Sequence, residues 1–148
     1  MTYNEKVANK LNELLQKTFY SEKGFKKAAH YAKNEELKVF FKNGAKQRKE
    51  FGNKLKYEIK SFHATAEDMG SLVGSGHLLW MDAKLLLSSN EKMTLLKSII
   101  KEEHSIVLKY KNVINKLKLP FETKNILMAQ KNQLEIDISK LSDIKEEF

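Results

Sequence analysis

The chain has 148 residues, enough for one domain with a substantial core, and it has no cysteine, which excludes disulfides, thiol chemistry and cysteine-ligated zinc. It contains 27 basic and 19 acidic residues, a formal net charge of +8. There is no run of about 18 apolar residues, and the first residues are amphipathic and charged. The sequence therefore predicts neither a membrane span nor a signal peptide, and we expect a cytoplasmic protein.

The positive charge raises the question of a nucleic-acid partner. Arg48 is the only arginine, and every other basic residue counted above is a lysine. Proteins that read bases and phosphates favour arginine for its bidentate fork. The lysines are also interspersed with Glu and Asp along every segment. This pattern favours a solvated lysine-rich surface and argues against nucleic acid, with weak, salt-dependent DNA association left open.

Six glycines, one proline and the absence of alternating apolar runs predict an all-helical protein. The first helix is expected to begin with a capping box formed by Thr2 and Glu5. Asn34 reads as the N-cap of a second helix, so the turn between the two helices must be very tight. The second helix is expected to end at about Phe62, before the loop sequence ATAEDMGS.

A shorter helix is predicted over about residues 71–87. Ser88 and Glu91 have the spacing of a capping box that would open the next long helix. Pro120 suits the first turn of a last helix over 121–143, and residues 144–148 are expected to fray.

The helix lengths favour one arrangement of these elements. At 1.5 Å per residue the second helix would be about 42 Å long and the shorter one about 26 Å. Two antiparallel hairpins joined by a crossover that returns along the bundle fit these lengths, as in ferritin-like folds. In the alternative, the first four helices form the bundle and the last is an outer brace. We therefore predict a single all-α domain over 1–148, a ferritin-like four-helix bundle with one additional shorter helix.

Several polar residues interrupt the apolar stripes near the middle of their helices. Glu103 lies among Ile99, Ile106 and Val107, and Glu22 lies in the stripe of the first helix. A buried carboxylate without a partner is costly, so it either becomes neutral or finds a cation. The main prediction is a structural cluster of hydrogen bonds and ion pairs, with Arg48 as the cation. Its expected members are Glu22, Gln47, Arg48, His77 and Glu103.

A metal site formed by Glu22, Glu50 and Glu103 is the alternative. Di-iron carboxylate bundles use a glutamate from each of two helices and Glu-x-x-His from each of the other two. No Glu-x-x-His occurs in this chain, and Ile100 stands where a second carboxylate would precede Glu103. A metal ion needs several oxygen or imidazole ligands together. We expect no cofactor and predict no catalytic residue, with iron or another divalent metal as the alternative.

Four strings carry a family resemblance: NKLNELLQKTFYSEKGFKKAA, ELKVFFKNGAKQRKEF, GSLVGSGHLLWMDAK and EEHSIVLKY. They resemble the DUF2383 family of ferritin-like four-helix-bundle proteins over about residues 8–117. The resemblance implies a ferritin-like bundle in a bacterial protein whose biochemical role is not established.

The resemblance also places individual residues. It implies that eight residues of this chain correspond to motif residues of the family: Glu22, Gln47, Arg48, Gly70, Ser71, Leu72, His77 and Trp80. The family's fourth segment usually reads Glu-Arg-Gly-Glu-Asp, and this chain keeps only Glu103 of its glutamates, with Ile100 in place of the first. The family's Glu after the Ala-Ala pair is His30 here. These departures argue against a two-metal centre.

We therefore expect a non-enzymatic bundle that acts through protein association, self-association included, or in a stress-related role. The alternative is a degenerate carboxylate site for iron, with storage or oxidoreductase activity.

Overall fold

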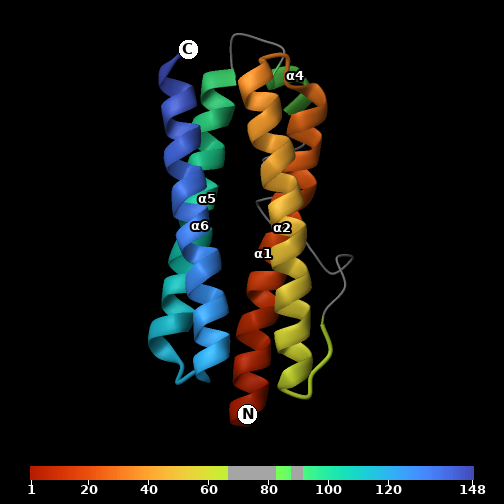
Figure 1. Cartoon of the computed structure of the whole chain (residues 1–148), viewed down its shortest axis with the longest axis vertical. Helices are drawn as coiled ribbons and strands as arrows, with labels where there is room; N and C mark the ends of the chain where they lie inside the picture. The colour runs from red at the N-terminus through yellow and green to blue at the C-terminus, as the bar shows by residue number, and fades with distance from the viewer. Residues whose placement is uncertain (67–82, 88–91) are drawn as a thin grey trace.

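The computed structural model describes residues 1–66, 83–87 and 92–148. All regular structure in these ranges is helical: α1 (Tyr3–Tyr31), α2 (Glu35–Ser61), α4 (Ala83–Leu87), α5 (Lys92–Lys116) and α6 (Phe121–Glu146). The four long helices form two antiparallel hairpins, α1 with α2 and α5 with α6, which lie side by side (Figure 1). The end of α2 and the start of α5 lie at opposite ends of the bundle. This is the predicted all-helical four-helix bundle, and α6 is its fourth member rather than an outer brace.

The two predicted N-terminal caps are present. The Thr2 hydroxyl accepts a hydrogen bond from the backbone N–H of Glu5 at 3.1 Å, and the Glu5 carboxylate accepts one from the Thr2 N–H at 3.4 Å. The Asn34 side chain accepts a hydrogen bond from the Leu37 N–H at 2.9 Å. Only Ala32 to Asn34 separate α1 from α2, so the tight turn and the hairpin it creates are confirmed.

The expected shorter helix is only partly described by the structure, and the last helix has different bounds from those expected. Of the shorter helix over 71–87, the structure describes only its end, α4; residues 71–82 and the capping box from Ser88 to Glu91 lie outside the described residues. Pro120 is the N-cap of α6 rather than part of its first turn. The expected end of α6 at residue 143 is wrong, because the helix continues to Glu146 and buries Ile144 against the core.

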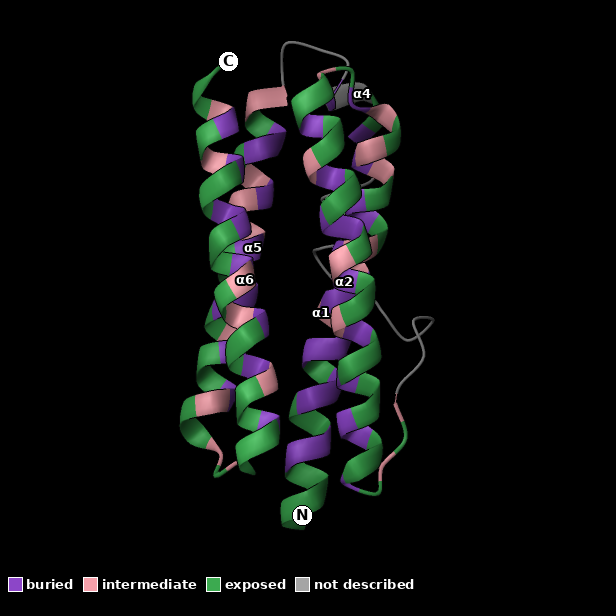
Figure 2. Cartoon of the chain, viewed as in Figure 1, coloured by how far each residue is buried: buried purple, intermediate pink, exposed green. Residues whose placement is uncertain are grey.

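The core consists of two apolar clusters, one toward each end of the bundle, and Figure 2 shows the buried positions recurring along all four long helices. On α1 the first cluster ends at Phe19 and the second begins at Phe25. On α5 the change falls between Ile99 and Ile106, on either side of Glu103. A polar layer therefore crosses the bundle between the two clusters. None of the described helices is long and apolar enough to cross a membrane.

Candidate functional site

Arg48 lies at the centre of this polar layer, and its side chain is 1% exposed. Its Nε donates a hydrogen bond to the Ser21 hydroxyl on α1 at 2.7 Å. Its Nη2 donates to Oε1 of Glu103 on α5 at 2.8 Å, and its Nη1 donates to Oδ2 of Asp137 on α6 at 3.1 Å. One guanidinium therefore joins all four long helices.

The remaining contacts of the guanidinium come from its own helix and from one aromatic ring. Nη1 also donates to the Gln47 side-chain oxygen at 3.2 Å and to the Gly44 carbonyl at 3.3 Å. The guanidinium carbon lies 4.0 Å from the centre of the Phe25 ring, a cation–π contact. A Cβ at Gly44 would lie 2.5 Å from Cδ2 of Phe25. Glycine at 44 therefore lets the ring sit close enough to α2 to cover Arg48.

The carboxylates of Glu103 and Asp137 differ in their hydrogen-bond partners. Oε1 of Glu103 accepts from both Arg48 and the Ser21 hydroxyl, the latter at 2.9 Å. Oδ1 of Asp137 accepts from the Gln133 amide at 3.1 Å, while Oδ2 faces Arg48. Oε2 of Glu103 is buried and has no hydrogen-bond partner among the described residues. Charged hydrogen bonds of this kind are roughly twice as strong as neutral ones, so the geometry of the cluster is tightly specified.

A second buried hydrogen bond links α5 and α6 next to the cluster. The Tyr110 hydroxyl donates to the Gln130 side-chain oxygen at 2.5 Å, and the Gln130 amide donates to the Phe51 carbonyl at 3.3 Å. Burial raises the pKa of Tyr110 above its ordinary value, an effect that Thr18 and Arg48 partly oppose. The phenol therefore remains a neutral donor at physiological pH.

The structure brings together some of the predicted cluster residues and separates others. Gln47, Arg48 and Glu103 are in direct contact. Glu22 instead forms an ion pair with Lys26 at 3.0 Å, at the edge of α1. Ser21 takes the inward position that was assigned to Glu22. His77 lies outside the described residues.

The described side chains at the centre of the bundle do not fit a metal ion. Glu50 is exposed and Glu22 faces Lys26, so neither joins Glu103. Among the described residues, no group of three or more Asp, Glu, His or Cys side chains is arranged to hold a metal. The free Oε2 of Glu103 could supply one ligand, but a metal ion needs several and would be repelled by the adjacent guanidinium.

Sequence reasoning missed Asp137, although its spacing offered a signal. Gln130, Leu134, Asp137 and Leu141 follow one another at intervals of four, three and four residues and are all buried. The intervals match one face of a helix. An acidic residue in a series with this spacing is the signal that Asp137 faces the core.

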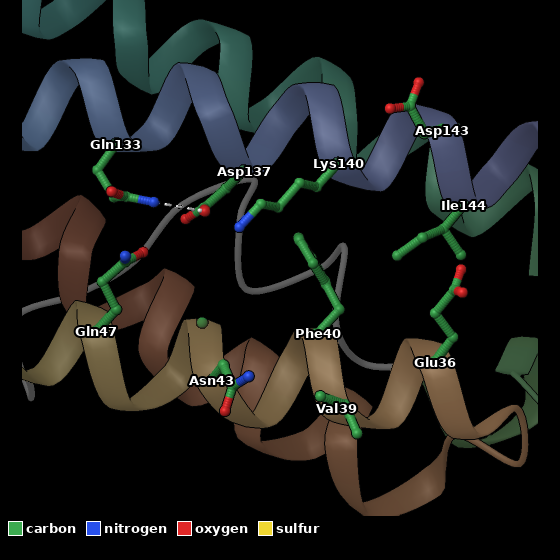
Figure 3. Close-up of a pocket in the computed structure, with 11 residues that line it drawn as sticks. Glu36, Val39, Phe40, Asn43, Gln47, Gln133, Asp137, Lys140, Asp143 and Ile144 are labelled. Atoms are coloured by element: carbon green, nitrogen blue, oxygen red, sulfur yellow. Dashed lines mark hydrogen bonds between the residues drawn. The ribbon is translucent and has the colours of Figure 1, made fainter.

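A pocket of about 410 Å³ opens between α2 and α6 beside the cluster (Figure 3). Gln47, Gln133 and Asp137 line the part of the pocket nearest the cluster. The Lys140 side chain extends from α6 into the space between Asp137 and Phe40. The pocket thus gives solvent access to the edge of the cluster, while Arg48 itself stays covered.

A family model, the domain of unknown function DUF2383, matches residues 6–116. The chain belongs to the DUF2383 family. The match covers α1, α2 and α5, and with them Ser21, Arg48 and Glu103. Asp137 lies on α6, beyond the part of this DUF2383 protein that the family model matches.

Comparison with solved structures supports the ferritin-like fold of this DUF2383 protein. It is similar, with a TM-score of 0.68 and 14% identity, to a protein described as a dodecameric thioferritin, the bacterioferritin-related protein from Bacteroides fragilis. The match covers 98% of this chain and 91% of that chain. Comparison with curated proteins gives no match.

Proposed function

We propose that this DUF2383 protein is a non-enzymatic ferritin-like bundle whose internal cation is the Arg48 side chain, and that it acts by associating with further copies of itself. The observation that carries the proposal is the guanidinium at the centre of the bundle, contacted from all four long helices. A buried guanidinium with carboxylate partners fixes how the helices align, which is a structural role.

The polar groups of the cluster form hydrogen bonds with one another. The Ser21 hydroxyl accepts a hydrogen bond from Arg48 and donates one to Glu103, so both its proton and an acceptor lone pair are used within the cluster. Asp137 is held between Arg48 and Gln133. A catalytic base or nucleophile needs a lone pair directed at a substrate. The arrangement therefore supports a structural centre over a reactive one.

A metal titration tests the non-enzymatic part of the proposal. We expect anaerobic addition of Fe(II), and separately of Zn(II), to give no saturable binding by calorimetry, because the guanidinium occupies the position that a cation would need. Elemental analysis of the purified protein should show substoichiometric metal. Stoichiometric binding that disappears in Glu103→Gln would overturn the proposal in favour of a carboxylate metal site.

The outer face of α6 is the surface we propose for self-association. Phe121, Met128 and Ile136 are 79%, 38% and 48% exposed and follow one another at intervals of seven and eight residues. These intervals place them on one side of the helix, opposite the buried series that contains Leu134. Asn125, Asn132 and Ser139 lie on the same line and are uncharged, while Glu135 flanks the line and Asp143 continues it beyond Ser139.

From Phe121 to Ser139 this stripe contains no charged residue, although the chain has a net charge of +8. Because the chain has a net positive charge, an uncharged surface lets two α6 helices approach with less like-charge repulsion than a lysine-rich surface would. The structural neighbour described as dodecameric supports an assembling bundle, although it is a different protein. We therefore commit to a second copy of this chain as the occupant of the α6 stripe.

The double substitution Met128→Lys and Ile136→Lys is expected to weaken self-association about 100-fold or more, because each lysine would have to be desolvated in the interface. Sedimentation velocity over a range of protein concentrations measures the effect. The matched control replaces two exposed apolar residues on other helices, Tyr57→Lys and Leu108→Lys, and should associate like wild type. A wild-type protein that is monomeric throughout, or equal losses in both variants, would contradict the proposal.

A further inference from the structure

A groove between α1 and α2, with a volume of about 590 Å³, is bordered by several lysines. Its basic residues include Lys26, Lys38, Lys42, Lys46 and Lys49. Glu35 is the only carboxylate among the described residues that line it. The floor is built from small apolar side chains, among them Ala29 and Ala45. The groove thus combines small apolar side chains with a strongly positive rim.

Four of these lysines form a row along α2. Lys38, Lys42, Lys46 and Lys49 recur at intervals of three or four residues and are all exposed. At 1.5 Å per residue the row is about 16 Å long, with one ammonium group per helical turn. None of the four forms an ion pair with a described residue, whereas Lys26 is paired with Glu22. The row therefore carries charge that no described carboxylate neutralises.

Acidic residues of α2 flank the lysine row in the sequence. Glu35 and Glu36 precede the row and Glu50 follows it, while residues 38–49 contain no Asp or Glu. Nucleic acid was not expected from the sequence because lysines and acidic residues are mixed over the chain as a whole. In the helix, Glu36 faces the pocket beside α6 and Glu50 does not line the groove. Of these three acidic residues, Glu35 alone lines the groove, and the lysines outnumber it there.

We propose that this groove binds the sugar-phosphate backbone of double-stranded DNA without reading its sequence. A row of evenly spaced ammonium groups matches a polymer with evenly spaced monoanions, and such contacts supply the affinity of non-specific DNA binding. Lysine binds phosphate as a point charge and lacks the fork with which arginine reads bases. Apart from His30, no ring side chain is found among the described residues of the groove, so there is no platform for unpaired bases. The occupant favoured by these features is a duplex.

Fluorescence anisotropy with a short labelled DNA duplex tests this proposal on the full-length chain. With four phosphate contacts, the logarithm of the association constant should fall with the logarithm of salt with a slope of about −3.6, which is about 150-fold between 50 and 200 mM. In the triple variant Lys38→Gln, Lys42→Gln and Lys46→Gln, the slope should drop to about −0.9 and the loss over that range to about 4-fold. All three lysines are exposed on α2, so the variant should fold normally, as circular dichroism can verify.

The matched control removes the same charge elsewhere. Lys97→Gln, Lys101→Gln and Lys116→Gln are exposed positions on α5, and this variant should keep the wild-type slope. Absence of binding at about 50 mM salt would overturn the proposal, since low salt favours phosphate contacts. Equal weakening of the two triple variants would assign the binding to net charge, and tighter binding of single-stranded DNA would replace the duplex as the occupant; either result also overturns it.

Discussion

Glu103→Arg is expected to remove a large part of the protein's free energy of unfolding at neutral pH. The substitution would place a second guanidinium where Oε1 of Glu103 now lies 2.8 Å from Arg48, in side chains that are 5% and 1% exposed. Breaking a buried ion pair by removing one partner costs about 3–5 kcal/mol, and burying two like charges adds to this. Because a small domain is stable by only about 5–15 kcal/mol, the loss is a large part of the free energy of unfolding. Urea denaturation followed by circular dichroism measures it.

The neighbouring residue provides the control. Glu102 pairs with Lys17 at 3.8 Å, and both side chains are about a quarter exposed. Pairs near the surface contribute about 1 kcal/mol or less, so Glu102→Arg should leave the denaturation midpoint close to wild type. If Glu103→Arg were as stable as Glu102→Arg, the buried position of Glu103 and its ion pair would both be in error.

Removing the cation alone should be far worse than removing the whole ionic cluster. Arg48→Met is expected to lower the free energy of unfolding by about 3–5 kcal/mol, because Glu103 and Asp137 would remain buried without their cation. Adding Glu103→Gln and Asp137→Asn to Arg48→Met should recover much of that loss, since no buried carboxylate would then be left without its cation. Urea denaturation of the single and triple variants at the same pH provides the comparison.

A second triple variant separates this coupling from a general effect of charge. It combines Arg48→Met with Glu50→Gln and Glu122→Gln, two exposed carboxylates, and has the same net charge as the first. This variant should be as unstable as Arg48→Met alone. Equal stability of the two triple variants would mean that Glu103 and Asp137 do not depend on Arg48.

Much of the fold follows from local chemistry that sequence makes visible. The caps at Thr2 and Asn34 depend on residues within three positions of one another, so the starts of α1 and α2 could be predicted. The apolar spacing also identified Arg48 and Glu103 as inward-facing. Because buried residues of opposite charge are expected to pair, their ion pair could be predicted as well. Whether α6 joins the bundle depends on packing between distant segments, which the helix lengths alone could not decide.

Helical spacing alone could not predict which polar residue of α1, Ser21 or Glu22, faces the cluster. Thr18 and Phe25 are both buried, and residues 21 and 22 lie on either side of the line that joins them. Glu22 and Ser21 were therefore equivalent by periodicity. The difference comes from the partner helices, because only the residue at 21 lies within reach of both Arg48 and Glu103. A serine there satisfies both groups, while Glu22 keeps its charge near solvent with Lys26.

The division of the core has a consequence for how the molecule opens. Each apolar cluster contains residues from α1, α2, α5 and α6. Detaching one helical hairpin from the other would expose both clusters and break the Arg48 contacts to Glu103 and Asp137 at the same time. Fraying from one end exposes a single cluster and stops at the polar layer. Partial unfolding is therefore least costly from the tips of the bundle inward, with the layer around Arg48 as the last part to come apart.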